Sequence, residues 1–109
     1  MNATEELSVL ADYSFDEKTI NIHPNDGYDL GLMMTEAVVR IFVGCSMEEF
    51  QSGQAKHVFG NLYLRNETKA GTVELSLRTA QKIGRPRHVR LYYDDSDGEK
   101  YGKLYLQPE

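Results

Sequence analysis

The sequence predicts one mainly β domain over residues 1–109, a single antiparallel β-sandwich or small barrel that one short helix near residues 46–52 makes α+β at the margin. Three observations support this fold class. Several stretches alternate apolar and polar residues with the period of a strand, and turn-forming residues separate these stretches. The length suits one domain, and 40% hydrophobic with 27% charged residues is an ordinary globular balance.

The stretch His88–Gln107 gives the most detailed expectation. Asp97-Gly98 is a dipeptide favoured in two-residue hairpin turns, and a reversal there places Leu91 opposite Leu104. One face of this hairpin then holds apolar residues, which we expect on the core, while the other holds cations and phenols. The apolar set is Val89, Leu91, Tyr93, Leu104 and Leu106, and the second set is Arg90, Tyr92, Tyr101, Lys103 and Tyr105.

The segment Leu7–Pro24 is predicted to form a first hairpin. Apolar and polar residues alternate on both sides of the polar turn Asp16-Glu17-Lys18, loosely before it and cleanly after it. Pro24 ends the second strand of this hairpin, and Asn25-Asp26-Gly27 is a further turn signal.

The segment Tyr28–Val43 admits two interpretations. Its apolar residues fit a helical stripe, with Asp29 at the N-cap and Gly44 as a stop. The β-branched and aromatic residues of its second half favour a strand instead. We favour a buried strand from about Thr35 to Val43, preceded by a second extended piece, but periodicity alone leaves the helix open.

The next signal is a capping box at Ser46-Met47-Glu48-Glu49, which predicts a short helix ending near Ser52-Gly53. After it we expect a strand, a polar loop, a second strand and one helical turn that stops at a glycine: His57–Arg65, Asn66–Gly71, Thr72–Arg78 and Thr79–Ile83. No internal repeat and no linker is visible in the sequence.

Charge is unevenly distributed along the chain. Residues 1–53 contain ten acids and two bases, whereas residues 54–109 contain ten bases and seven acids, which gives the overall net charge of −5. Such asymmetry bears on partners and association rates rather than on the fold. One interpretation is that the two halves neutralise each other across one domain.

Cysteine content and the chain start predict a soluble cytoplasmic protein. Cys45 is the only cysteine, so it cannot form an internal disulfide, which fits a reducing compartment. The opening MNATEELSV lacks the basic region and apolar run of a signal peptide. The most apolar segment, Leu30–Val43, is too short and too polar to span a bilayer.

Motifs for catalysis and metal binding are missing from the sequence. The histidines His23, His57 and His88 lie far apart, and the single cysteine has no neighbour with which to build a zinc site. There is no glycine-rich phosphate loop, no serine elbow and no zinc-protease motif. We therefore expect a non-enzymatic protein with neither metal nor cofactor.

The acidic, tyrosine-rich tip of the last hairpin is the leading candidate for partner binding. Clustered carboxylates steer basic partners, and tyrosine is frequent at the energetic centres of interfaces. The predicted partner-binding residues are Asp94, Asp95, Asp97, Glu99 and Tyr101, with Asp26 and Asp29 as a second group.

A basic cluster supports a competing interpretation. The run from Val73 to Leu106 resembles the swapped-hairpin motif of AbrB-like DNA-binding proteins: strand, one helical turn closing on Ile83-Gly84, strand, acidic turn at Asp97-Gly98, strand. The resemblance implies two interlocked hairpins in a dimer, with basic residues of one face on DNA. The phosphate contacts that it implies here are Arg78, Lys82, Arg85 and Arg87.

Three functions are consistent with these features, in decreasing order of preference. The first is a protein-binding module, similar in composition to small acidic immunity proteins, that binds and blocks a basic partner such as a nuclease toxin. The second is an AbrB-like dimeric DNA-binding regulator or antitoxin, although a net charge of −5 opposes non-specific duplex binding. The third is a phage-type structural protein that assembles with copies of itself.

Overall fold

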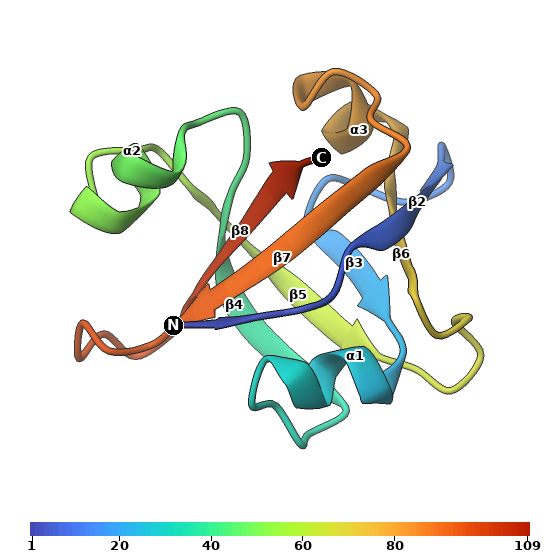
Figure 1. Cartoon of the computed structure of the whole chain (residues 1–109), viewed down its shortest axis with the longest axis horizontal. Coiled ribbons are helices and arrows are strands. Elements are labelled where there is room, and N and C mark those ends of the chain that lie inside the picture. The colour runs from blue at the N-terminus through green and yellow to red at the C-terminus, as the bar shows by residue number, and fades with distance from the viewer.

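The computed structural model describes residues 1–109 and contains eight strands and three short helices (Figure 1). The strands are β1 (Asn2–Ala3), β2 (Leu7–Asp12), β3 (Thr19–Ile22), β4 (Glu36–Phe42), β5 (Val58–Leu64), β6 (Thr72–Ser76), β7 (His88–Asp94) and β8 (Lys103–Pro108). The helices are α1 (Pro24–Asp29), α2 (Met47–Ser52) and α3 (Leu77–Lys82). The mainly β fold class is confirmed.

Seven strands close into a barrel in the order β7-β2-β6-β3-β5-β4-β8, because β8 pairs with β7 as well as with β4. Three of the ladders are parallel, namely β2–β6, β3–β5 and β4–β8, and antiparallel ladders lie between them. The small barrel is therefore confirmed, whereas the sandwich and the fully antiparallel sheet are wrong. Closure of the ring removes the free edges that a sandwich would leave.

Two units of the same architecture build most of this barrel. Each unit runs strand, strand, helix, strand: β2-β3-α1-β4 and β5-β6-α3-β7. In this comparison β2 corresponds to β5, β3 to β6 and β4 to β7. The central strands β3 and β6 pair antiparallel with each other. The first strand of each unit pairs parallel with the central strand of the other unit, in β2–β6 and β3–β5, and antiparallel with the last strand of that other unit, in β2–β7 and β4–β5. Strand β8 lies between β4 and β7 and completes the ring.

The equivalence of the units extends to single residues. Thr19–Gly31 and Thr72–Gly84 have the same length, and each runs through a strand, an N-cap, a short helix and a glycine with positive φ, 79° at Gly31 and 86° at Gly84. Identical residues occur only at the first and last positions of the two segments. The sequence hides this repeat because burial and capping, rather than residue identity, are what the two copies share.

The first predicted hairpin, Leu7–Pro24, is wrong. Strands β2 and β3 form as expected, but β6 lies between them, parallel to β2 and antiparallel to β3. Alternation identifies strands without identifying their neighbours, since a period of two is the same for every partner. The interlocking of the two units decides the pairing, and it buries Val73 and Leu75 of β6 completely.

The segment that follows β3 is helical rather than a turn and an extended piece. His23 caps α1 through its imidazole Nδ1, which accepts a hydrogen bond from Asn25 N at 3.0 Å, and Pro24 occupies the first turn, where a missing N–H costs nothing. The favoured strand from about Thr35 to Val43 is confirmed as β4, Glu36–Phe42.

The last hairpin forms with a register two residues away from the predicted one. Leu91 faces Leu106 rather than Leu104. A shift by two leaves each side chain on its face, so the expected apolar face is buried in the barrel. A longer connection, residues 95–102, replaces the predicted two-residue turn. That turn needs positive φ at both central residues, and only Gly98, with a φ of 78°, has it, whereas Asp97 does not.

The second face of the hairpin is not open to water along its length, because α2 covers part of it. The capping box of Ser46 and Glu49 opens this helix as predicted. Phe50 of the helix stacks on Tyr105 with ring centroids 5.1 Å apart, and the Lys103 ammonium donates a hydrogen bond to the Phe50 carbonyl at 3.3 Å. Lys103 and Tyr105 are consequently buried.

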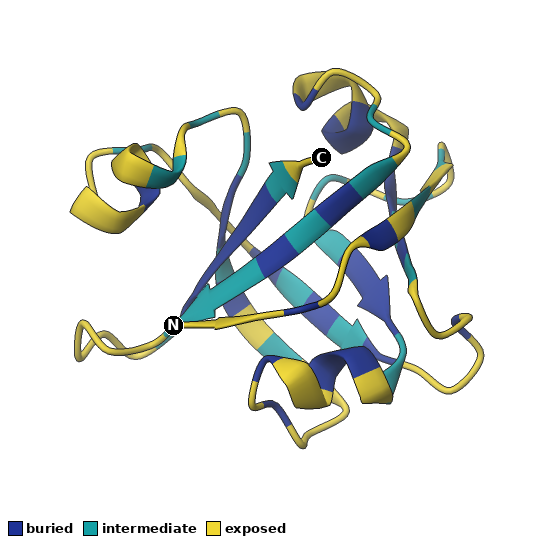
Figure 2. Ribbon diagram, in the orientation of Figure 1, coloured by how far each residue is buried: buried dark blue, intermediate teal, exposed yellow.

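Buried positions lie along the strands of the barrel, where they alternate with more exposed ones (Figure 2). Aliphatic side chains from every strand of the ring fill the interior, where Leu7, Ile20, Leu62 and Leu91 are fully inaccessible. A second, aromatic cluster around Phe42, under α2, covers part of the outer wall. Exposed residues gather in the loops and on the helices, which is where surfaces for binding remain.

Candidate functional site

The acidic connection between β7 and β8 is held in place by an arginine of β4. Arg40 Nη2 lies 2.8 Å from Asp97 Oδ2, and Arg40 Nε donates a hydrogen bond to the Tyr101 carbonyl at 2.8 Å. The hydrogen bond and charge of Arg40 lower the pKa of Asp97. Asp97 is therefore bound within the protein and fixes the loop for its neighbours.

The other carboxylates of this loop differ in their freedom. Asp94 accepts hydrogen bonds from the Ser96 hydroxyl and backbone amide, which lower the pKa of Asp94. Asp95 and Glu99 are exposed and take part in no hydrogen bond or ion pair through their carboxylates. Asp95 and Glu99 are thus the loop carboxylates open to a partner.

A hollow of about 270 Å³ lies beside Asp94 and Asp95. Its other walls come from the N-terminal strand, the connection after α1 and the ring of Tyr93, and they include Leu32 and Met34. The same Leu32 and Met34 also line a second hollow, of about 280 Å³, beside α1. The two hollows are therefore parts of one surface.

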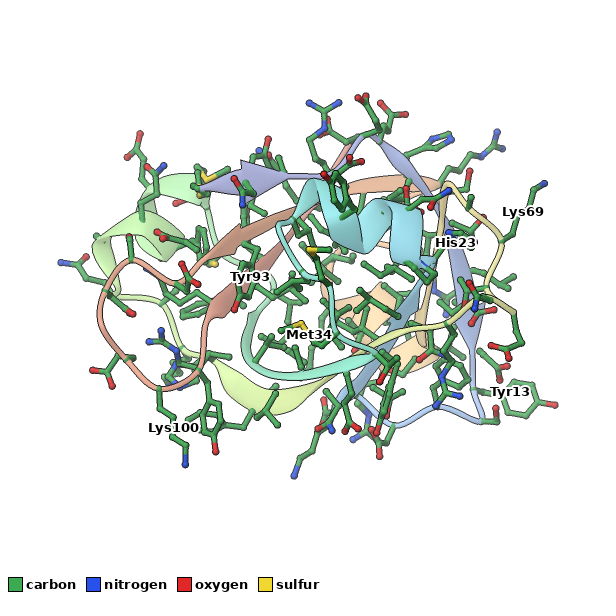
Figure 3. All side chains as sticks on the ribbon, turned by 90° about the horizontal axis from the view of Figure 1, so that it is seen from below. Tyr13, His23, Met34, Lys69, Tyr93 and Lys100 are labelled. Atoms are coloured by element: carbon green, nitrogen blue, oxygen red, sulfur yellow. The ribbon has the colours of Figure 1, made fainter.

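Exposed apolar side chains stand on this surface. Met33 is 83% exposed, Tyr28 68% and Met34 48%. Viewed from below the barrel, Met34 lies near the centre of this end of the molecule with Tyr93 beside it (Figure 3). We name the surface the Met–Asp face: Tyr28, Met33, Met34, Asp94 and Asp95 line its hollows, and we include the exposed Asp29, which lies between Tyr28 and Leu30 at the end of α1.

The second predicted acidic group divides. Asp29 is exposed at the end of α1, on the Met–Asp face. Asp26 is only 8% exposed, and its carboxylate accepts a hydrogen bond from Gly71 N at 2.9 Å. The Asp26 carboxylate therefore ties α1 to the loop after β5 and is not presented to a partner.

Tyr101 is engaged by other residues and lines neither hollow of the Met–Asp face. Its ring meets the Phe59 ring edge-on, with centroids 6.0 Å apart, and the Lys100 ammonium lies 5.3 Å from its centroid. Glu99 likewise lines neither hollow. The structure thus brings Asp94 and Asp95 together with the methionines and leaves Glu99 and Tyr101 apart from them.

The basic cluster surrounds α3. Arg78, Arg85 and Arg87 are exposed and have no carboxylate within ion-pair distance, whereas Lys82 binds Glu17 at 2.8 Å. Arg85 has a φ of 52°, the only positive value outside glycine. A hollow of about 440 Å³ lies beside the helix, and its walls are Tyr13, Phe15, Asp16, Glu17, Leu77, Arg78 and Gln81.

We name this second surface the arginine face: Tyr13, Leu77 and Arg78 line its hollow with Asp16 and Glu17, and we include the exposed cations on α3 and directly after it, Lys82, Arg85 and Arg87. Tyr13 is 89% exposed and points away from the barrel, on the opposite side of the view from Lys100 (Figure 3). All four cations that the sequence singled out lie on this face.

The exposed methionines are the residues that the sequence did not single out. Met33 and Met34 belong to the apolar residues of Tyr28–Val43 that fit a helical stripe in the sequence, and methionine is common in cores. The signal that marks them is their place in the short connection between Gly31, the glycine that follows α1, and the first residue of β4, because connections run over the surface of a domain.

Side chains suited to metal or nucleophilic chemistry do not converge. No group of three His, Cys, Asp or Glu residues is close enough to hold a metal ion. Cys45 packs against the aromatic cluster under α2, and burial raises the pKa of its thiol. No helix has the length and apolar character needed to cross a membrane.

Comparison with known proteins adds no relationship to this geometry. No protein-family model and no curated protein sequence matches the chain.

Proposed function

We propose that the protein is a non-enzymatic binding module whose Met–Asp face takes a basic protein partner. One observation supports this above the others: Met34 and Leu32 join two hollows into a surface where exposed apolar side chains stand beside carboxylates. Contiguous apolar exposure with a polar rim is the usual mark of an interaction site.

The two kinds of side chain suit two stages of binding. The carboxylates of Asp29 and Asp95 have no cation beside them, so their field is available to attract a basic surface. Methionine is flexible and polarizable, which lets Met33 and Met34 adapt to the apolar part of that surface once it has docked. The closed barrel behind the face supplies a stiff support.

The specific form that we propose is a small acidic inhibitor that covers and blocks a basic enzyme such as a nuclease toxin. Enzymes that act on nucleic acid carry cationic clefts, and an acidic surface of this kind competes with phosphate for them. Blocking needs only a rigid surface of complementary charge, which the Met–Asp face on the closed barrel provides.

Affinity capture with paired variants tests the proposal. Wild-type protein and Met33→Asp/Asp95→Lys are immobilised and exposed to extract of the source cell, and Leu10→Asp/Glu67→Lys is the matched control with the same changes elsewhere. We expect a basic protein that the wild type and the control retain and the face variant loses. Its association rate should fall steeply with salt. Equal retention by the face variant would contradict the site.

The arginine face supports a second candidate, duplex DNA binding. Arg78, Arg85 and Arg87 are exposed without an acidic partner, and such cations contribute affinity by releasing counterions from phosphate. In this case the protein retards duplex DNA at low salt, and Arg78→Glu/Arg87→Glu abolishes the retardation while the Met–Asp variant retains it. No retardation of the wild type at low salt removes the candidate.

A further inference from the structure

The Met–Asp face and the arginine face occupy equivalent places in the two units of the barrel. Helix α1 corresponds to α3, and each helix borders one hollow. Asn25 and Tyr28 line the hollow beside α1, and the residues at the same positions of the second unit, Arg78 and Gln81, line the hollow beside α3. The same backbone arrangement thus presents two surfaces.

The two surfaces have opposite charge. Asp29 of α1 has its equivalent in Lys82 of α3, and Asn25 has its equivalent in Arg78. Asp29 and Asp95 have no cation at ion-pair distance on the first face, and Arg78 and Arg87 have no carboxylate on the second. Each face therefore holds exposed charges that form no ion pair within the chain, although Glu17, whose pKa is lowered mainly by Lys82, also lies near enough to Arg78 for the arginine charge to lower that pKa.

The two surfaces also match in shape and apolar character. Met33, 83% exposed, projects from the Met–Asp face. The arginine face has a hollow of about 440 Å³ whose apolar walls are Tyr13, Phe15 and Leu77. A thioether side chain in contact with aromatic rings gains packing beyond what aliphatic contact provides.

We propose that copies of this chain associate head to tail, with the Met–Asp face of one copy on the arginine face of the next. The inference rests on the proposed function, because it names the partner of the same Met–Asp face: the basic surface is supplied by a second copy. One contact then covers both exposed apolar groups and neutralises both sets of free charges. Because the two surfaces differ, the contact is heterologous and repeats along a ring or filament.

The arginine face of a second copy supplies the basic surface that the proposed function requires. The acids of the Met–Asp face come from both units, since Asp29 ends α1 whereas Asp94 and Asp95 end and follow β7. The arginine face holds the cations of α3 and of the residues after it, and two acids of the first unit, Asp16 and Glu17, also line its hollow. The excess of cations on this face lets an acidic face of the next copy be added without net repulsion at the contact.

Concentration and salt provide the first test. The wild-type protein is followed by sedimentation up to about 1 mM protein at about 20 mM salt and again at about 500 mM salt, which shortens the range of charge interactions several-fold. We expect the mean mass to rise with concentration at low salt, and association to weaken at least about tenfold at high salt. A protein that stays monomeric at about 1 mM and low salt overturns the inference.

Complementation between two variants provides the second test. Variant Asp29→Lys/Asp95→Lys has two basic faces, and variant Arg78→Glu/Arg87→Glu has two acidic faces, so each alone should remain monomeric. Mixed together, the two variants should associate, because each supplies the face that the other has lost. These side chains are exposed and make no hydrogen bond in the fold, and circular dichroism verifies that both variants are folded.

Matched charge changes away from both faces serve as controls. Glu48→Lys/Glu67→Lys and Lys56→Glu/Lys69→Glu change the net charge by the same amounts, and both should associate as the wild type does. The inference is overturned if either of the two face variants, tested alone, associates like the wild type, or if their mixture stays monomeric. A monomeric wild type that nevertheless retains a basic protein through the Met–Asp face leaves the proposed function standing, so the two failures are distinguishable.

Discussion

Two units with the same order of strands and helix carry opposite charge in this barrel. Residues 7–42 have six acids and two bases, whereas residues 58–94 have seven bases and three acids. Their helices begin after an extended N-cap, end before a glycine of positive φ, and sit at equivalent places on the ring. The comparison teaches that the fold requires the caps, the glycines and the buried aliphatic positions, and leaves the outer charge free to serve binding.

The largest expected difference between the units concerns how closely each helix packs on the barrel. A Cβ at Gly27 would overlap the side chain of Leu64, which is buried, whereas the equivalent position of α3 already carries Ala80. Gly27→Ala should therefore lower the free energy of unfolding by about 1–3 kcal/mol through overpacking, although alanine favours a helix. Urea unfolding measures the change.

The reverse substitution is the matched control. Ala80→Gly creates no clash and should cost about 1 kcal/mol, the difference in helix propensity plus a small loss of packing. Adding Leu64→Ala to Gly27→Ala should remove the overlap, so the two costs should not add. If Gly27→Ala were as stable as the wild type, α1 would have room for a Cβ as α3 does. The expected difference in how closely the two helices pack on the barrel would then be wrong.

The two N-caps should differ by a smaller amount. Ser76 is buried, and its hydroxyl oxygen accepts from Thr79 N at 2.9 Å while also bonding the Thr79 hydroxyl at 2.9 Å. His23 is half-buried and caps α1 with a single bond at 3.0 Å. Ser76→Ala should lower the free energy of unfolding by about 1–2 kcal/mol, and His23→Ala should lower it by about 0.5 kcal/mol. Thermal unfolding of both variants measures the two changes. Equal costs would indicate that the caps are interchangeable.

The smallest expected effect is the pH dependence of the Arg40–Asp97 ion pair. Arg40 holds the pKa of Asp97 below its ordinary value of 3.8. A carboxylate whose pKa falls on folding adds stability above its ordinary pKa, and this stability is lost as the pH drops through the folded pKa. The stability difference between wild type and Asp97→Asn should thus be present at neutral pH and shrink below pH 3.8.

Removal of the arginine controls for this assignment. In an Arg40→Gln background, Asp97→Asn should change the pH dependence of unfolding much less. If the pH dependence were the same in both backgrounds, the pair would not be its source. The contrast between the paired Arg40 of the first unit and the unpaired Arg78, Arg85 and Arg87 of the second would then have no effect on the pH dependence.

Local patterns predicted several elements because their causes are local. The capping box at Ser46 specifies α2 by bonds within one turn, and the β-branched run before Gly44 specifies β4. The alternation in the last hairpin chose the buried face correctly even though the register is two residues away from the expected one. Face and element type depend on a few neighbouring residues, which a sequence displays.

The candidate site was predicted only in part, because exposure at a surface depends on residues that are distant in the sequence. Asp94 and Asp95 form part of the Met–Asp face, and the four predicted cations lie on the arginine face. Asp26 was grouped with the acids, yet the fold buries it against Gly71. Exposure of Met33 and burial of Asp26 depend on what the chain places over each of them, and this is fixed by residues far away in the sequence.

The sequence by itself determined the mainly β class, the helix after Ser46, the inward face of the last hairpin and the separation of acids from bases along the chain. Only the tertiary structure decided which strands are neighbours, that two units of one architecture interlock, and that methionines and aspartates share a surface. The physical reason is that propensity, capping and alternation act within a few residues. Strand partners are instead chosen by how the whole chain closes its ring and buries its aliphatic faces.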